Sequence, residues 1–194
     1  MVQHSILGNL ITPKHFVRFY DDDDALVKEV AQFISSGFLA GHGGIVIATQ
    51  PHRQALERRL IASGCDLAAV LQTSRYVALD AAETLSRFMV GGWPDETRFS
   101  EVVGSLIASA EERHSWVRAF GEMVAILWAE GKQDAAVQLE RLWTRLCEAR
   151  TLSLFCAYPI QYVQKEESSN HFMDICTEHS QVLLPNPLNT SSSL

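Results

Sequence analysis

The sequence predicts a three-layer α/β sandwich, in which helices cover both faces of a mostly parallel central sheet. Short apolar stretches alternate along the chain with longer stretches of helical periodicity. Strand–helix–strand units of this length imply right-handed crossovers between parallel strands. Residues 45–48, Ile-Val-Ile-Ala, are apolar at every position, which is typical of a strand buried on both faces of a parallel sheet. The order of the strands is not readable from the sequence.

The first strand is expected at residues 15–20, followed by a helix from Asp22 to Leu39. Apolar residues recur through this helix at close to the helical period. Glycines at 41, 43 and 44 indicate its end. The remaining strands are expected at 45–48, 76–79, 116–120 and 152–158. The remaining helices are expected at about 51–63, 67–71, 81–90, 95–111, 122–129 and 132–149.

The 194 residues suit one domain with a short appendage. We expect an N-terminal extension over 1–12, the α/β domain over 13–160, a helical appendage over 161–183 and a disordered tail over 184–194. The appendage is polar, with a short helix expected at about 171–178. The tail is rich in Pro, Asn, Ser and Thr, which disfavours a packed core.

Four consecutive carboxylates, Asp21 to Asp24, occupy the corner between the first strand and the first helix. In a nucleotide-binding α/β domain this corner is rich in glycine, and its N–H groups cradle phosphate with the help of a Lys. Here a phosphate would meet like charge. Carboxylates at a helix N-terminus cap free N–H groups and favour folding. We therefore expect this corner to keep the shape of a nucleotide-binding fold without binding a nucleotide. We also expect its carboxylates to cap the helix rather than to form a metal site.

Composition excludes several functional classes. The formal net charge is −7, and nonspecific binding to nucleic acid or to anionic membrane needs a basic surface. No apolar run approaches the ~20 residues of a membrane span, and no signal peptide is recognisable. The four cysteines are scattered without a CxxC pair or zinc-like spacing, so buried thiols in a reducing cytoplasm are expected, with no metal or cofactor.

Short blocks along the chain resemble the methanogen/methylotroph sensory (MEDS) domain family over roughly residues 13–180. The blocks are Phe19–Asp21, Ile47–Thr49 with His52, Gly64–Leu67, Leu79–Ala81, Gly92–Asp95, Val117–Val124, Leu139–Trp143 and Cys156–Pro159. The resemblance implies a sensory module, usually joined to histidine kinase, response-regulator or DNA-binding parts, with hydrocarbon derivatives as proposed ligands. It also implies distant kinship with RecA-type and KaiC-type ATPases whose P-loop is lost. No such output segment is recognisable here, so output is expected through a separate partner.

The candidate ligand site follows from the rule that open parallel sheets bind ligands beyond the carboxyl ends of their strands. The candidates are Tyr20, Asp21, Thr49, His52, Asp80, Phe120, Glu122 and Tyr158, with Arg118 within the fourth strand. Together they would form an aromatic rim with a few polar groups that orient a ligand.

Several candidates have a structural alternative. His52 is a ligand contact or a surface residue, Asp80 a helix cap, and Glu122 either orients a ligand or caps its helix. Arg118 lies within an apolar strand, so its charge needs a partner. A salt bridge with Glu122 or Asp80 is favoured over an anion-orienting role.

The sequence thus predicts a cytoplasmic, non-catalytic sensory module that binds a small, largely apolar molecule at the strand ends. A histidine kinase, a response regulator or another signalling protein is the expected partner, without nucleic acid or membrane, and a homodimer is left open. The sequence contains neither a Gly-x-Ser-x-Gly elbow nor a Walker Lys at the first corner, so these motifs give no support for an enzyme. One rival is an interaction module presenting Trp128 and Trp143, whose helical spacing otherwise indicates core. The other is an unconventional nucleotide binder in which Arg53, Arg75 and Arg118 meet.

Overall fold

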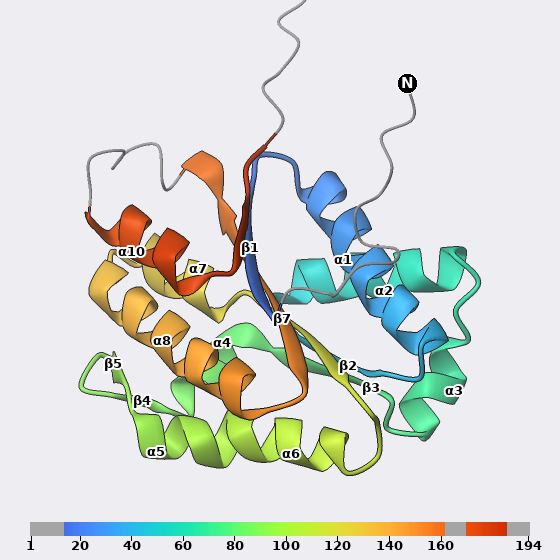
Figure 1. The fold of residues 1–194 in the computed structure, drawn as a ribbon. Helices are drawn as coiled ribbons and strands as arrows, with labels where there is room; N and C mark the ends of the chain where they lie inside the picture. The colour runs from blue at the N-terminus through green and yellow to red at the C-terminus, as the bar shows by residue number, and fades with distance from the viewer. Residues whose placement is uncertain (1–13, 162–169, 186–194) are drawn as a thin grey trace, which may run out of the picture.

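A computed structural model describes residues 14–161 and 170–185 and contains a six-stranded sheet, all parallel, with strand order β3-β2-β6-β7-β1-β8 (Figure 1). The strands are β1 (His15–Tyr20), β2 (Gly43–Ala48), β3 (Tyr76–Asp80), β6 (Val117–Gly121), β7 (Leu152–Pro159) and β8 (Gln181–Leu183). The predicted extension over 1–12 and residues 186–194 of the predicted tail lie outside the described residues, as does 162–169 of the appendage.

Helices cover both faces of the sheet, which confirms the predicted three-layer α/β architecture (Figure 1). One layer holds α1 (Asp23–Leu39), α2 (Gln50–Ala62) and α3 (Leu67–Gln72). The other holds α4 (Ala81–Ser86), α5 (Glu96–Phe99), α6 (Ser105–Glu111), α7 (Met123–Ala129), α8 (Gln133–Ala149) and α10 (Asn170–Glu178). No helix within the described ranges is both long and apolar enough to cross a bilayer.

Alternation along the strands divides the core between the two faces of the sheet. On β1, Phe16 packs in the cluster with α1 and α2, whereas Val17 and Phe19 pack in the cluster with α7 and α8. On β7, Phe155 and its neighbours follow the same alternation. Because side chains of successive strand residues point to opposite faces, each central strand contributes to both cores.

The helix predicted for residues 81–90 is wrong in its second half. It ends at Ser86, and β4 (Met89–Val90) pairs antiparallel with β5 (Trp93–Pro94). Gly91 and Gly92 form the turn with φ angles of 58° and 88°, a conformation that glycine adopts without strain. The two-residue turn signal was present in the sequence, but the strands are too short to show an alternating pattern.

Two other segments differ in detail from the prediction. The helix expected at 95–111 contains a π-helical turn, Ser100–Gly104, between α5 and α6. The appendage contributes a strand as well as a helix, because β8 pairs parallel with β1 at the edge of the sheet. A three-residue strand carries too few positions for its period to be recognised in the sequence.

Candidate functional site

A pocket of about 570 Å³ lies beyond the carboxyl ends of β1, β2 and β7. It is lined by Tyr20, Asp21, Asp23, Thr49, Pro51, His52, Pro159, Ile160 and Gln161. Four of these, Tyr20, Asp21, Thr49 and His52, are residues that the sequence placed at a strand-end site. The structure therefore brings together candidates from the first two strand ends, at the edge of the sheet where the topology predicts a ligand.

Glu122, which follows β6, holds two residues of the pocket lining, Thr49 and His52, in place. Its carboxylate is 5% exposed and accepts hydrogen bonds from the Thr49 backbone N–H at 2.7 Å and the Thr49 hydroxyl at 3.2 Å. It also forms a hydrogen bond with Nδ1 of His52. Glu122 stands at the N-cap position of α7 but makes no capping bond to that helix. Its carboxylate instead accepts from the N–H of Thr49, the N-cap residue of α2, and so places a negative charge at the start of a helix whose first turn has no acidic residue.

The electrostatics of His52 are set by carboxylates on two sides. The hydrogen bond to Glu122 raises the pKa of the imidazole, and the charges of Glu122 and Asp23 act in the same direction against the effect of burial. Asp23 Oδ2 lies 3.7 Å from Nε2 of His52. The Tyr20 ring lies edge-on to the imidazole with centroids 6.3 Å apart. His52 thus lies between two carboxylates, with Glu122 at Nδ1 and Asp23 near Nε2.

The acidic corner caps α1, as the sequence predicted. Asp22 is the N-cap residue, and its Oδ1 accepts from the backbone N–H of Asp24 at 2.8 Å and of Ala25 at 3.4 Å. Asp24 forms an exposed ion pair with Arg59 of α2 at 3.1 Å. The N–H groups that a P-loop would offer to phosphate are therefore bonded to a carboxylate, and further negative charges surround them.

Asp80 ends β3, the edge strand next to β2, and is the N-cap residue of α4, as expected. It accepts from the N–H groups of Ala82 and Glu83, at 3.0 and 3.1 Å, and forms an ion pair with Arg53 at 2.9 Å. The hydrogen bond from the Glu83 N–H is the largest cause that lowers the pKa of Asp80. Asp80 does not line the pocket.

Phe120 and Tyr158 are buried in the core, so neither forms the aromatic rim that the sequence suggested. Phe120 packs edge-on against Phe155, with centroids 5.5 Å apart. Tyr158 is fully buried on the opposite face and donates a hydrogen bond to Oε1 of Glu140 at 2.7 Å. Alternation explains the difference, because a side chain within a strand points into one of the two helical layers.

Arg118 lies near the start of β6, at the end of the sheet opposite the pocket. Its guanidinium donates to the carbonyl of Phe33 and the hydroxyl of Ser36, both at 2.7 Å, and to Nδ1 of His42 at 3.3 Å. The prediction of a salt bridge from Arg118 to Glu122 or Asp80 is wrong, since Glu122 binds His52 and Asp80 binds Arg53. Arg118 thus joins β6 to the C-terminal half of α1, since both Phe33 and Ser36 belong to that helix.

Arg75 acts at the same helix end and donates to the carbonyls of Phe38 and His42. Arg53 is held by Asp80 at the other end of the sheet. The three arginines therefore do not converge on one site. Trp128 and Trp143 are 3% and 1% exposed, which confirms them as core residues rather than an interface.

The sequence missed five of the residues that line the pocket. Asp23 and Pro51 belong to the first turns of α1 and α2, and Pro159, Ile160 and Gln161 follow β7. The available signal was position alone, since each adjoins a strand end or a helix start. The residues that the sequence missed thus come from the first turns of two helices and from the segment at the end of β7.

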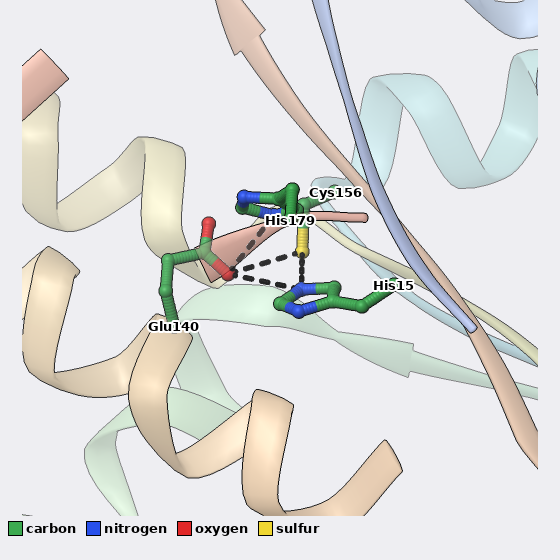
Figure 2. Close-up of side chains that lie close together, drawn as sticks. All are labelled: His15, Glu140, Cys156 and His179. Carbon is green, nitrogen blue, oxygen red and sulfur yellow. Dashed lines mark hydrogen bonds and ion pairs between the residues drawn. The ribbon is translucent and has the colours of Figure 1, made fainter. Parts of the chain in front are cut away.

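Atoms suited to a metal gather elsewhere in the part of the chain that the structure describes. His15, Glu140, Cys156 and His179 are buried, and one potential ligand atom from each lies within 4.8 Å of all the others (Figure 2). The group lies on the α8 side of the sheet. It is separate from the strand-end pocket, whose lining contains none of these four residues.

Comparison with known proteins gives one family match. The family described as the methanogen/methylotroph, DcmR sensory domain (MEDS) matches residues 14–172, which is most of the chain. No curated protein matches the chain. Because the match spans the sheet from β1 to β7 and both helical layers, the chain belongs to the MEDS sensory domain family.

Proposed function

We propose that this MEDS domain binds a small, largely apolar organic molecule in the strand-end pocket and signals its presence to a separate protein. Membership of a sensory domain family indicates a role in sensing or signalling. The proposal adds the site, the ligand class and a non-catalytic mechanism. A histidine kinase, a response regulator or another signalling protein is the proposed recipient.

The single observation that carries the proposal is the pocket at the carboxyl ends of β1, β2 and β7. Its volume of about 570 Å³ lies within the roughly 300–1,000 Å³ range of small-molecule sites. Tyr20, Pro51, Pro159 and Ile160 supply apolar surface, and Thr49 and Gln161 can orient a polar group. An organic molecule whose apolar part contacts the first group and whose polar atoms face the second would suit this lining.

The charges around the pocket favour a neutral or cationic ligand over an anion. Asp21 and Asp23 lie at its wall, and the carboxylate of Glu122 lies beneath Thr49 and His52. Both long helices that begin at this edge already have carboxylates at their N-termini, Asp22 for α1 and Glu122 for α2. A nucleotide phosphate would meet a carboxylate at the start of either helix, which argues against the nucleotide-binding alternative.

The pocket and its outer helices offer a route for signalling. α1 and α2 both begin at the pocket, and the Asp24–Arg59 ion pair joins them on the exposed side. A ligand that contacts Tyr20 and His52 would touch the start of both helices. A change in their relative position is the proposed output, because a ligand can shift only an equilibrium between states that it binds differently.

The experiment is a thermal-shift screen of the full chain against small neutral, cationic and anionic organic compounds. Neutral or cationic compounds should raise the Tm, since a ligand at 100 times its Kd stabilises by about 2.7 kcal/mol. Tyr20→Ala and His52→Ala should abolish the shift, whereas the control His171→Ala should keep it, because neither His171 nor its partner Asp134 lines the pocket. A screen in which no compound stabilises the protein, or in which hits act equally on the Tyr20 and His52 variants, contradicts the proposal.

A further inference from the structure

Four buried side chains from four separate segments converge on the α8 side of the sheet (Figure 2). His15 begins β1, Cys156 lies within β7, Glu140 projects from α8, and His179 follows α10. Oε2 of Glu140 lies 3.3 Å from Nε2 of His15, 3.4 Å from Sγ of Cys156 and 3.5 Å from Nε2 of His179. Sγ of Cys156 lies 3.5 Å from Nε2 of His15.

Surrounding groups orient both imidazoles with Nε2 toward the centre. The Thr144 hydroxyl donates to the carbonyl of Glu178, so at 3.1 Å its oxygen accepts a hydrogen bond from Nδ1–H of His15. The carbonyl of Ile175 accepts from Nδ1–H of His179 at 2.6 Å. In the neutral form of each imidazole, Nε2 then carries a lone pair, which is the arrangement that metal-binding histidines have.

The carboxylate of Glu140 is oriented in the same way. Tyr158 donates to Oε1 at 2.7 Å, which leaves Oε2 directed at the two histidines and the thiol. Nε2 of His179 is fully buried and makes no hydrogen bond within the described residues, although it lies at an ion-pair distance of 3.5 Å from Oε2 of Glu140. A buried polar atom without a hydrogen bond is costly, and a bound ion would satisfy it at a shorter distance than this contact does.

Four of the six separations among these atoms match the edges of a tetrahedron around zinc. Zn–N and Zn–O distances near 2.0–2.1 Å and a Zn–S distance near 2.3 Å place neighbouring ligand atoms about 3.3–3.6 Å apart. Four of the six separations lie between 3.3 and 3.5 Å, and all four ligand atoms lie within 4.8 Å of one another. Two imidazoles, one thiolate and one carboxylate are a donor set that suits Zn²⁺ better than Mg²⁺ or Ca²⁺.

We propose that His15, Glu140, Cys156 and His179 bind one Zn²⁺ ion in a closed, structural site. Four protein ligands leave no position for a substrate or a reactive water, which is typical of structural rather than catalytic zinc. Binding converts the Cys156 thiol to a thiolate and releases its proton to solvent. In the sequence the ligands are separated by 125, 16 and 23 positions, so no local zinc motif was recognisable.

Zinc would join the C-terminal segment to the body of the domain. Three ligands belong to the domain body, whereas His179 lies between α10 and β8, beyond the part matched by the family. The neighbouring residue Ser180 also binds β1, because its N–H and its hydroxyl both donate to the carbonyl of His15. Removing the metal should therefore loosen residues 170–183 before the rest of the sheet.

The first test uses the unmodified full chain, purified without chelators from zinc-supplemented medium. Elemental analysis should find about one zinc ion per chain. Protein refolded from urea in zinc should have a higher Tm and slower amide exchange over residues 170–183 than protein refolded in EDTA. If the chain retains no zinc and refolds identically in both buffers, the cluster is a metal-free hydrogen-bonded group and the proposal is overturned.

Cobalt substitution and variants then identify the ligands. The Co²⁺ form should show the absorption of a tetrahedral thiolate complex, and Cys156→Ser and His179→Gln should lose it. Cys147→Ser is the matched control, because Cys147 is also buried but lies outside the ligand group. Thr144→Val keeps all four ligands and removes only the hydroxyl that orients His15, so zinc affinity should fall by roughly 10–100-fold. Unchanged cobalt spectra in Cys156→Ser would contradict the assignment even if other variants fail to fold.

Discussion

The carboxylate of Glu122 accepts a hydrogen bond from the backbone N–H of Thr49 at 2.7 Å, across 73 positions of sequence. This contact ties the end of β6 to the end of β2 and supplies the first turn of α2 with the negative charge that its own sequence lacks. The same carboxylate holds His52 at the wall of the pocket. One buried side chain thus stabilises a helix and positions a candidate ligand contact.

Glu122→Gln should lower the free energy of unfolding by about 1.5–3 kcal/mol, because bonds from Thr49 and His52 lose a charged acceptor. Urea denaturation measures this change. The control is Glu130→Gln, which breaks an exposed pair with Lys132 and should cost less than about 1 kcal/mol. Equal effects of the two variants would show that the buried carboxylate has no special role.

The pKa of His52 should lie above the usual 6.5, because its hydrogen bond to Glu122 favours the imidazolium. A group whose pKa is raised by folding stabilises the folded state fully below its unfolded pKa of about 6.5, and this contribution is lost as pH rises through the raised value. NMR titration of the imidazole measures the pKa directly. Glu122→Gln should lower it, and a wild-type pKa at or below 6.5 would contradict this interpretation.

Arg118→Met should lower the free energy of unfolding by about 1.5–3 kcal/mol, because the carbonyl of Phe33 and the hydroxyl of Ser36 in α1 lose a charged donor. Arg113→Met is the control, since Arg113 forms an exposed contact with Ser109. Compounds that bind the pocket should produce the same Tm shift in Arg118→Met as in the wild type. Loss of that shift would support the anion-orienting role that the sequence left open.

Gly37→Ala should destabilise the domain, although glycine within a helix is normally less favourable than alanine by roughly 0.5–1 kcal/mol. A Cβ atom at position 37 would lie 2.7 Å from Cδ of Arg118 and 3.1 Å from its Nε. The guanidinium would have to leave its partners on α1. In Arg118→Met the same change should cost less, which a double-mutant cycle measures; additive effects would contradict this coupling.

The sequence was sufficient for the fold where an element carries many periodic residues. All five long strands and the long helices α1 and α8 were predicted within a few positions, because burial on one or two faces leaves a repeated pattern. The β4–β5 hairpin and β8 were missed. Their two or three residues per strand are held by pairing across the sheet rather than by local pattern.

The site was predictable only in part, for a geometric reason. Residues just after a strand end, such as Tyr20 and Thr49, could be assigned to the rim from chain position. The partners of Arg118 and Glu122 lie 70 to 85 positions away and depend on strand order, which the sequence does not give. The four-residue cluster around Glu140 required both the order of β1, β7 and β8 and the packing of α8.

The central claim is that carboxylates at the helix N-termini leave this edge of the sheet to a small organic ligand rather than to a nucleotide. The most direct measurement is amide NMR mapping of the full chain, titrated with hits from the screen and, separately, with Mg·ATP. Organic hits should shift the amides of Tyr20, Thr49, His52 and Gln161, and Mg·ATP should leave them unchanged. Saturable shifts at residues 21–24 with Mg·ATP, and none at the pocket with organic compounds, would contradict the account.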